Sequence, residues 1–176
     1  MGMDQAQRAD FHAYVVARSA ALLRTAYLLT GNRADAEDLL QTTLAKTYLA
    51  WDRIRDREAL DGYVRRTMVN TQTSFWRRKK PEALYDELPE HPGRDAHSDS
   101  DLHDALWTAL ARLSRKQRAT VVLRYYEDLS EADTAAALGI SIGTVKSTTS
   151  RALAALRQDA SLRDDPRAAL PLGAQS

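Results

Sequence analysis

The segment SIGTVKSTTSRALAALR, from Ser141 to Arg157, has the residue types of a helix that contacts nucleic acid. Its first half is rich in small hydroxyl residues and glycine, and no acidic residue occurs from residue 140 to residue 158. Short donors and a cation suit the leading end of a helix that enters a DNA groove, because bulky side chains would hold it away from the bases and phosphates would repel acids. The residues that fit this role are Ser141, Gly143, Thr144, Lys146 and Ser147.

The residues before this segment predict the first helix of a helix-turn-helix. Ser130 can cap a short helix that Gly139 ends, and Ser141 can cap the next one. Ala135 would let the two helices approach closely, Gly139 can take a positive φ, and Val145 can fill the corner between them. A short surface helix rich in serine and threonine is the alternative interpretation of the same pattern.

Three longer helices are predicted ahead of this unit from apolar residues that recur every three to four positions. They cover about residues 11–29, 35–51 and 60–76, and Gly31 follows the first. Helices of this length form a small bundle. Two further helices are predicted over about 102–113 and 115–128, the second capped by Ser114.

The net charge of +1 conceals an uneven distribution along the chain. Residues 63–80 contain six basic residues and no acid, whereas residues 82–104 contain eight acids and one arginine. Residues 81–100, which overlap this acidic stretch, hold three of the five prolines, which is typical of a linker. We therefore predict an all-α protein with two small helical domains. The predicted organisation is a helical domain over 8–80, a flexible acidic linker over 81–100, a helix-turn-helix domain over 101–158 and a flexible tail over 159–176.

The composition argues against several classes of function. The chain has no cysteine, which excludes disulfides and thiolate metal sites, and no apolar run approaches the length of a bilayer span. His91, His97 and His103 lack the spacing of a metal site, and no glycine-rich phosphate loop or serine elbow is present. We expect a cytoplasmic protein that is not an enzyme and needs no metal, ATP or other cofactor, with neither signal peptide nor membrane helix.

Three motifs in order carry a family resemblance: DAEDLLQTTLAKTYLAW, then GYVRRTMVNTQTSFWRRKK, then LSRKQRATVVLRYYEDLSEADTAAALGISIGTVKSTTSRALAALR. Over roughly residues 8–158 the chain resembles the extracytoplasmic-function (ECF) class of bacterial RNA polymerase sigma factors, and most closely the actinobacterial SigE-like subgroup. The resemblance implies a subunit that binds core RNA polymerase and directs promoter recognition, DNA melting and transcription initiation. The first domain would engage the polymerase and the minus-10 element, and the second the minus-35 element.

The resemblance also implies partners and the residues that meet them. The partners would be the β′ clamp helices and β flap of the core polymerase, promoter DNA in double-stranded and single-stranded form, and an anti-sigma factor, which is typical of the class. The residues matched to the clamp-binding surface are Asp38, Gln41, Thr42 and Lys46. Thr42 departs from the family pattern, in which glutamate is common at this position.

The third predicted helix matches the part of the family that binds the minus-10 element. The matched residues are Tyr63, Arg65, Arg66, Asn70, Thr73, Trp76, Arg77 and Arg78. Asn70 corresponds to an asparagine beside an unstacked base, and the loop over 52–62 would form the pocket for that base. Trp76 has two interpretations, a stacking platform or a core anchor at the helix end.

The recognition helix matches the family's minus-35 reader. Its expected DNA contacts are Ser141, Gly143, Thr144, Lys146, Ser147 and Arg151. Relatives often carry arginine then leucine where this chain has Thr148 and Thr149, so the base preference is open. Arg118 and Arg124 would either touch upstream phosphates or be solvated.

Some alternatives stay open at this stage. The acidic linker would either thread the channel that nascent RNA uses, as in relatives, or act as a plain tether. The segment LSEADTAAALGISIGTVKS also resembles the terminal helix-turn-helix of LuxR-type regulators, although the basic, aromatic third helix argues against the receiver or sensor domain that those proteins carry. An interaction adaptor is the third candidate class.

Overall fold

A computed structural model describes residues 4–54, 56, 59–79 and 107–158 of the chain. The side chains of residues 76–79 are outside this description. The predictions for Trp76, Arg77 and Arg78 therefore lie outside the described side chains, and those for the linker over 81–100 and the tail over 159–176 lie outside the described residues.

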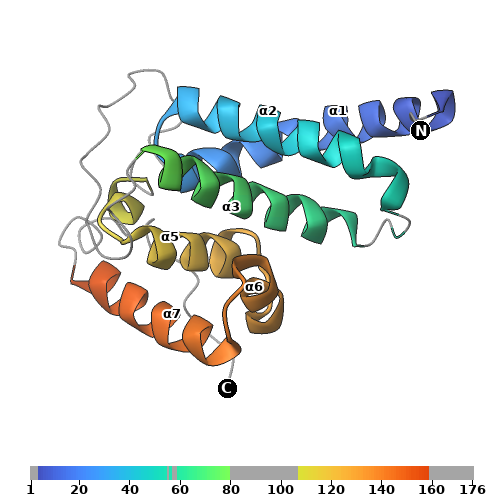
Figure 1. Ribbon diagram of the computed structural model, residues 1–176. Helices are drawn as coiled ribbons and strands as arrows, with labels where there is room; N and C mark the ends of the chain where they lie inside the picture. The colour runs from blue at the N-terminus through green and yellow to red at the C-terminus, as the bar shows by residue number, and fades with distance from the viewer. Residues whose placement is uncertain (1–3, 55, 57–58, 80–106, 159–176) are drawn as a thin grey trace.

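The first part of the chain forms three long helices that lie alongside one another (Figure 1): α1 (Gln5–Thr30), α2 (Arg33–Ala50) and α3 (Leu60–Lys79), with a short 3-10 turn η1 (Trp51–Arg53) after α2. Asp4 caps α1 in a reciprocal capping box with Gln7. Gly31 ends α1 with a φ of 88°, and Asn32 caps α2. These local signals produce the sharp turn that lays α2 against α1.

The second part consists of shorter helices. Residues 107–111 are helical and are followed by α5 (Arg115–Val121), a π-helical turn η2 (Val122–Tyr126), α6 (Glu131–Leu138) and α7 (Ile142–Arg157). Ser114, Ser130 and Ser141 cap α5, α6 and α7, each accepting a hydrogen bond from the backbone three residues on. The all-α class predicted from the sequence is confirmed.

The helices α6 and α7 meet as the sequence predicts for a helix-turn-helix. Gly139 ends α6 with a φ of 65°, Ala135 is buried, and Val145 has no exposed surface. The small residue permits the close approach of the two helices, and the valine fills the corner. α7 packs against both α5 and α6, so one of its faces is fixed and the opposite face is open to a partner.

The two parts of the chain share one hydrophobic core. Its buried residues come from both sides of the predicted linker, including Leu28, Leu29 and Met68 on one side and Leu110 and Leu123 on the other. The helices α1 and α3 contact α5, η2 and α6, so the second part lies against the three-helix layer (Figure 1). The residue boundaries of the two domains stay a prediction, because their faces are packed together here.

Arg118 corrects an expectation from the sequence. It was expected at the surface, but it is 3% exposed and donates hydrogen bonds to the backbone carbonyls of Leu29, Leu110 and Leu113. Its guanidinium also lies over the ring of Trp107. Burial, together with the charge of Arg115, lowers the pKa of Arg118 to about 10. An arginine committed in this way holds the core together and cannot reach a phosphate.

Candidate nucleic-acid and polymerase interface

The outer face of α7 presents cationic and hydroxyl side chains. Lys146, Ser147 and Arg151 are exposed on it, and Ile142 adds an exposed apolar side chain at its leading end. Arg151 donates to the backbone oxygen and the hydroxyl of Ser147, at 3.3 and 3.4 Å, which holds the guanidinium along the helix. The α7 segment contains no acid. Such a face suits the phosphates and base edges of a DNA groove.

Two other predicted contacts at the start of α7, Ser141 and Thr144, have partly structural roles. The Ser141 hydroxyl accepts the Thr144 amide at 3.1 Å and lies 2.9 Å from the Thr144 hydroxyl, so both residues cap the helix. Gly143 is exposed, with only the Ser141 hydroxyl near the position of an added β-carbon. Thr148, where relatives often carry arginine, is 4% exposed and packs inward. Position 148 therefore offers no long side chain to a partner of α7.

The outward face of α3 collects several residues predicted for the minus-10 element. Arg66, Asn70 and Thr73 are exposed at spacings of four and three residues, so they lie on one stripe of the helix. Tyr63 is half-buried beside them. The stripe combines a cation, an amide and a hydroxyl, the groups that hold an unpaired base and its backbone.

Arg65 points away from this stripe, toward the second part of the chain. Its Nε lies 2.6 Å from the Glu127 carboxylate, which comes directly after η2. Arg65 is one helix position from Arg66, which corresponds to about 100° around the helix. The structure thus separates Arg65 from the other predicted contacts on α3.

The polar face of α2 is open, and it ends in an apolar side chain. Asp38, Gln41, Ala45 and Leu49 are exposed along it, and Leu49 is 75% exposed. Thr42 is half-buried, and Lys46 donates a hydrogen bond of 2.9 Å to Thr71 on α3. Of the four residues predicted to meet the polymerase, Asp38 and Gln41 are therefore the most available to a partner.

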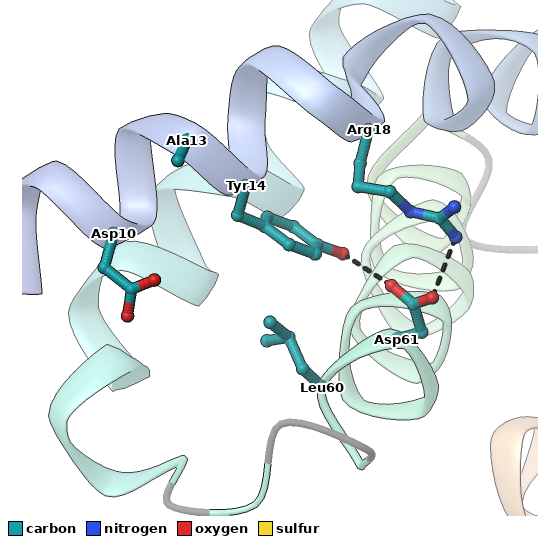
Figure 2. A pocket seen from close by; sticks show the side chains of 6 residues that line it. All are labelled: Asp10, Ala13, Tyr14, Arg18, Leu60 and Asp61. Atoms are coloured by element: carbon teal, nitrogen blue, oxygen red, sulfur yellow. Dashed lines mark hydrogen bonds and ion pairs between the residues drawn. The ribbon is translucent and has the colours of Figure 1, made fainter.

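A shallow pocket lies between α1 and the start of α3, next to the loop predicted to hold an unstacked base (Figure 2). It is lined by Asp10, Ala13, Tyr14, Arg18, Leu60 and Asp61. Asp61 accepts hydrogen bonds from the Tyr14 hydroxyl at 3.1 Å and from Arg18 at 2.8 Å. Burial, followed by the charge of Asp61, raises the pKa of Tyr14 well above its ordinary value. The hydrogen bonds of Tyr14 and Arg18 to Asp61 hold the start of α3 against α1, next to this loop.

Comparison with known families identifies both parts of the chain. A family model described as Sigma-70 region 2 matches residues 14–82, and one described as Sigma-70, region 4 matches residues 103–156. The RNA polymerase sigma-E factor of Streptomyces coelicolor is 50% identical over 164 residues, which cover 90% of this chain and 91% of that protein. The chain belongs to the sigma-70 family of RNA polymerase sigma factors.

Further relatives place this sigma factor in the ECF class. The ECF RNA polymerase sigma factor SigL of Mycobacterium tuberculosis is 33% identical, with 89% of this chain and 92% of that protein covered. Among solved structures, the sigma factor RpoE of Bartonella quintana, in complex with the anti-sigma factor NepR, matches with a TM-score of 0.68 and 29% identity. That match covers 89% of this chain and 98% of the other. The function expected from the resemblance is confirmed: the chain is a sigma factor that binds core RNA polymerase and directs promoter recognition, DNA melting and transcription initiation.

The alternative of a LuxR-type regulator is not favoured. The region 2 match extends over the first three helices of the sigma factor, where a LuxR-type protein would carry a receiver or sensor domain.

The described parts of the chain contain no group of His, Cys, Asp and Glu placed to hold a metal ion. Within those same ranges, no helix is both long and apolar enough to cross a membrane.

Sequence reasoning missed the exposed apolar residues on α2 and α7, and it missed two acidic residues that pair with residues of other helices. Ile142 and Leu49 fall on helical stripes that the printed sequence could have revealed. Glu127 and Asp61 gave no such signal, because their partners lie 62 and 43 residues away in the sequence.

Proposed function

We propose that three exposed faces of this sigma factor divide its work: α7 contacts the duplex minus-35 element, α3 the melted minus-10 element, and α2 the β′ clamp helices of the polymerase. The observation that carries the proposal is the outer face of α7, where Lys146, Ser147 and Arg151 stand exposed on an acid-free helix of a helix-turn-helix. Cations there attract phosphates, and the small neighbouring residues let the helix enter the groove.

Support for the minus-10 assignment comes from the exposed stripe of α3. Asn70 lies between Arg66 and Thr73, so an unpaired base placed against the amide would have its phosphates beside a cation. Stacking of a base on an aromatic side chain contributes roughly 1–3 kcal/mol, and Tyr63 is the nearest described aromatic on this face. The pocket over Asp61 lies at the end of the loop that would receive the base (Figure 2).

For the polymerase assignment, support comes from the mixed character of the α2 face. Asp38 offers an acid to a basic partner helix, and Leu49 offers an apolar contact at the other end of the stripe. Single exposed apolar side chains are ordinary on protein surfaces, so the assignment rests on the position of Leu49 on the same stripe as Asp38 and Gln41 and not on its exposure alone. The β flap would be met by the second part of the chain, and the linker would run between the two sites.

The sigma factor would itself catalyse no reaction, since bond formation in initiation belongs to the polymerase, and it would act in the cytoplasm with that enzyme. An anti-sigma factor is a further partner we propose, because the RpoE structure that matches this chain holds one. Two faces of the present fold, on α2 and α7, are open for such a partner.

The experiment that tests the proposal is transcription in vitro with core polymerase and the purified chain, followed by sequencing of the transcript 5′ ends. We expect initiation at a set of promoters that share two elements, and none with core enzyme alone. A regulator of the LuxR type would instead bind duplex DNA by itself and start no transcript without another sigma factor. Failure of the chain to co-purify with core enzyme would contradict the proposal.

A further inference from the structure

Glu127 occupies a specific position between the two parts of the chain. Its carboxylate accepts a hydrogen bond from Arg65 on α3 at 2.6 Å and another from the hydroxyl of Thr25 on α1. The side chains of Arg65 and Glu127 are 18% and 13% exposed, so the pair is largely shielded from solvent. An ion pair with little solvent around it is screened less by salt than one at the surface.

The backbone around Glu127 aims the carboxylate at α1 and α3. The π-helical turn η2 ends at Tyr126, and the amide of the next residue, Glu127, donates to the carbonyl of Val122 at 3.0 Å. Asp128 then adopts a φ of 51°, in the left-handed region that aspartate tolerates better than most residues. A π turn followed by a left-handed residue is an irregular way to leave a helix, and such turns often occur where a side chain has a function.

A second set of contacts closes the same seam beside the ion pair. Gln72 on α3 and Arg118 on α5 both donate to the backbone carbonyl of Leu29, at 2.5 and 3.4 Å. This carbonyl belongs to the last turn of α1, where helix carbonyls lack partners within the helix. Parts of the chain that the linker separates therefore satisfy each other's polar groups.

We infer that Glu127 is an intramolecular latch that competes with promoter DNA for Arg65. The inference rests on the proposed role of α3 in minus-10 binding. While the latch is closed, a carboxylate occupies the guanidinium and repels any phosphate that approaches it. When α3 and η2 separate, the guanidinium of Arg65 is released, and α3 presents a second cation about 100° around the helix from Arg66. The closed chain thus withholds part of its DNA affinity until a partner draws the two parts apart.

The test compares Glu127→Gln, which keeps the shape and removes the charge, with Asp128→Asn, which makes the same change at an exposed acid one residue away. Because the chain has no cysteine, Val16→Cys on α1 and Ala154→Cys on α7 can carry a donor and an acceptor dye at exposed positions of the full-length chain. We expect the Glu127→Gln chain to show lower transfer efficiency than the natural chain, and the Asp128→Asn chain to match it.

Fluorescence anisotropy then measures the binding of a labelled single-stranded oligonucleotide to the same full-length chains without dyes. We expect Glu127→Gln to bind about threefold to fivefold more tightly, because a larger fraction of the chain is open. The slope of log affinity against log salt should steepen by about 0.7, the value for one more phosphate contact on a single strand. Adding Arg65→Gln to Glu127→Gln should cancel both gains.

Each result either supports or overturns the latch. Equal transfer efficiency and equal affinity for Glu127→Gln, Asp128→Asn and the natural chain would overturn it, and so would opening without any gain in affinity. If Glu127→Gln fails to fold, Thr25→Val removes one donor to the same carboxylate, and the charge swap of Arg65→Glu with Glu127→Arg should restore the closed transfer efficiency. Specific initiation by the natural holoenzyme together with a negative latch result would leave the proposed function standing and remove only the latch.

Discussion

The indole ring of Trp107 lies where a side chain at Gly31 would have to be. The ring atom Cζ2 is 1.9 Å from the position of a β-carbon built on Gly31, and the ring meets Tyr27 edge to face with 6.1 Å between centroids. Gly31 ends the first helix, and Trp107 begins the described second part of the chain, so the contact spans the predicted linker. Only a glycine permits the tryptophan to cover the end of α1.

We predict that Gly31→Ala destabilises the fold by about 3 kcal/mol, because it adds a displaced Trp107 to the cost of a positive φ. Gly139→Ala is the matched control, since Gly139 also has a positive φ but has nothing within 4 Å of an added β-carbon. It should lose only about 1 kcal/mol. Urea unfolding followed by circular dichroism measures both, and equal losses would show that the Trp107 contact contributes nothing.

The buried guanidinium of Arg118 leads to the second prediction. Arg118→Ala leaves carbonyls of Leu29, Leu110 and Leu113 without that donor and should lower the free energy of unfolding by about 3 kcal/mol. Lys116→Ala, at an exposed position of the same helix, should change it by less than about 0.5 kcal/mol. The same denaturation experiment checks the pair, and similar losses for both would contradict the structural role of Arg118.

Gly139 and Arg118 show what could and could not be predicted from the sequence. Caps and turns were predictable, because Ser114, Ser130 and Ser141 act on amides three residues away and Gly139 acts on its own backbone. The exposed stripes of α2, α3 and α7 followed from helical spacing. The buried state of Arg118 did not, because in RKQR it has the same local sequence as the exposed Lys116, and its burial comes from tertiary packing that includes the carbonyl of Leu29, 89 residues away.

The pairing of Glu127 with Arg65 escaped prediction for the same reason. Separating the charges into blocks along the chain treats each basic residue as available to DNA, and this is correct for Arg66 but not for Arg65 in the closed fold. The two arginines are neighbours in the sequence and differ only in the side of α3 from which they project. Which side faces the second part of the chain is set by tertiary packing, which no short motif records.

The third prediction concerns the polymerase face of α2. Leu49→Glu should weaken the binding of core polymerase by about tenfold, because it places a charge in an apolar contact. Leu49 is 75% exposed, so the stability of the free chain should change by less than about 0.5 kcal/mol. The control is Val16→Glu, which alters a similarly exposed apolar residue on α1 (70%) and should leave polymerase affinity unchanged. Affinity can be measured by competition for labelled core enzyme, and equal binding by both variants would remove Leu49 from the interface.

The fourth prediction concerns Asn70. Asn70→Ala should reduce open-complex formation or the selectivity for the minus-10 sequence by about fivefold to tenfold, because an amide that contacts a base edge is lost. Core binding should stay the same, since the residue is exposed on α3 and apart from the α2 face. Permanganate footprinting of the melted strand measures opening. Ser74→Ala, at another exposed position of the same helix, serves as the control, and unchanged opening and base preference would exclude Asn70 from the site.

The fifth prediction concerns Lys146 and distinguishes minus-35 recognition from the binding of core polymerase. Lys146→Glu should lower transcription from a minus-35-dependent promoter by about thirtyfold to a hundredfold, because a cation next to phosphates becomes an anion. Transcription with Lys146→Gln should fall between that of the natural chain and that of Lys146→Glu, and the salt slope of DNA binding should decrease by about one. Core binding should be unaffected in both.

One alternative cause for that loss lies in the fold itself, because the Nζ of Lys146 is 3.6 Å from a carboxylate oxygen of Glu131 on α6. The two side chains are 64% and 39% exposed, and ion pairs this solvated contribute little to stability. Glu131→Gln removes the pair while keeping the lysine, so it should leave transcription within about twofold of the natural chain. A loss in Glu131→Gln as large as that in Lys146→Glu would mean that the lysine acts by holding α6 to α7, and its assignment to the minus-35 element would then be wrong.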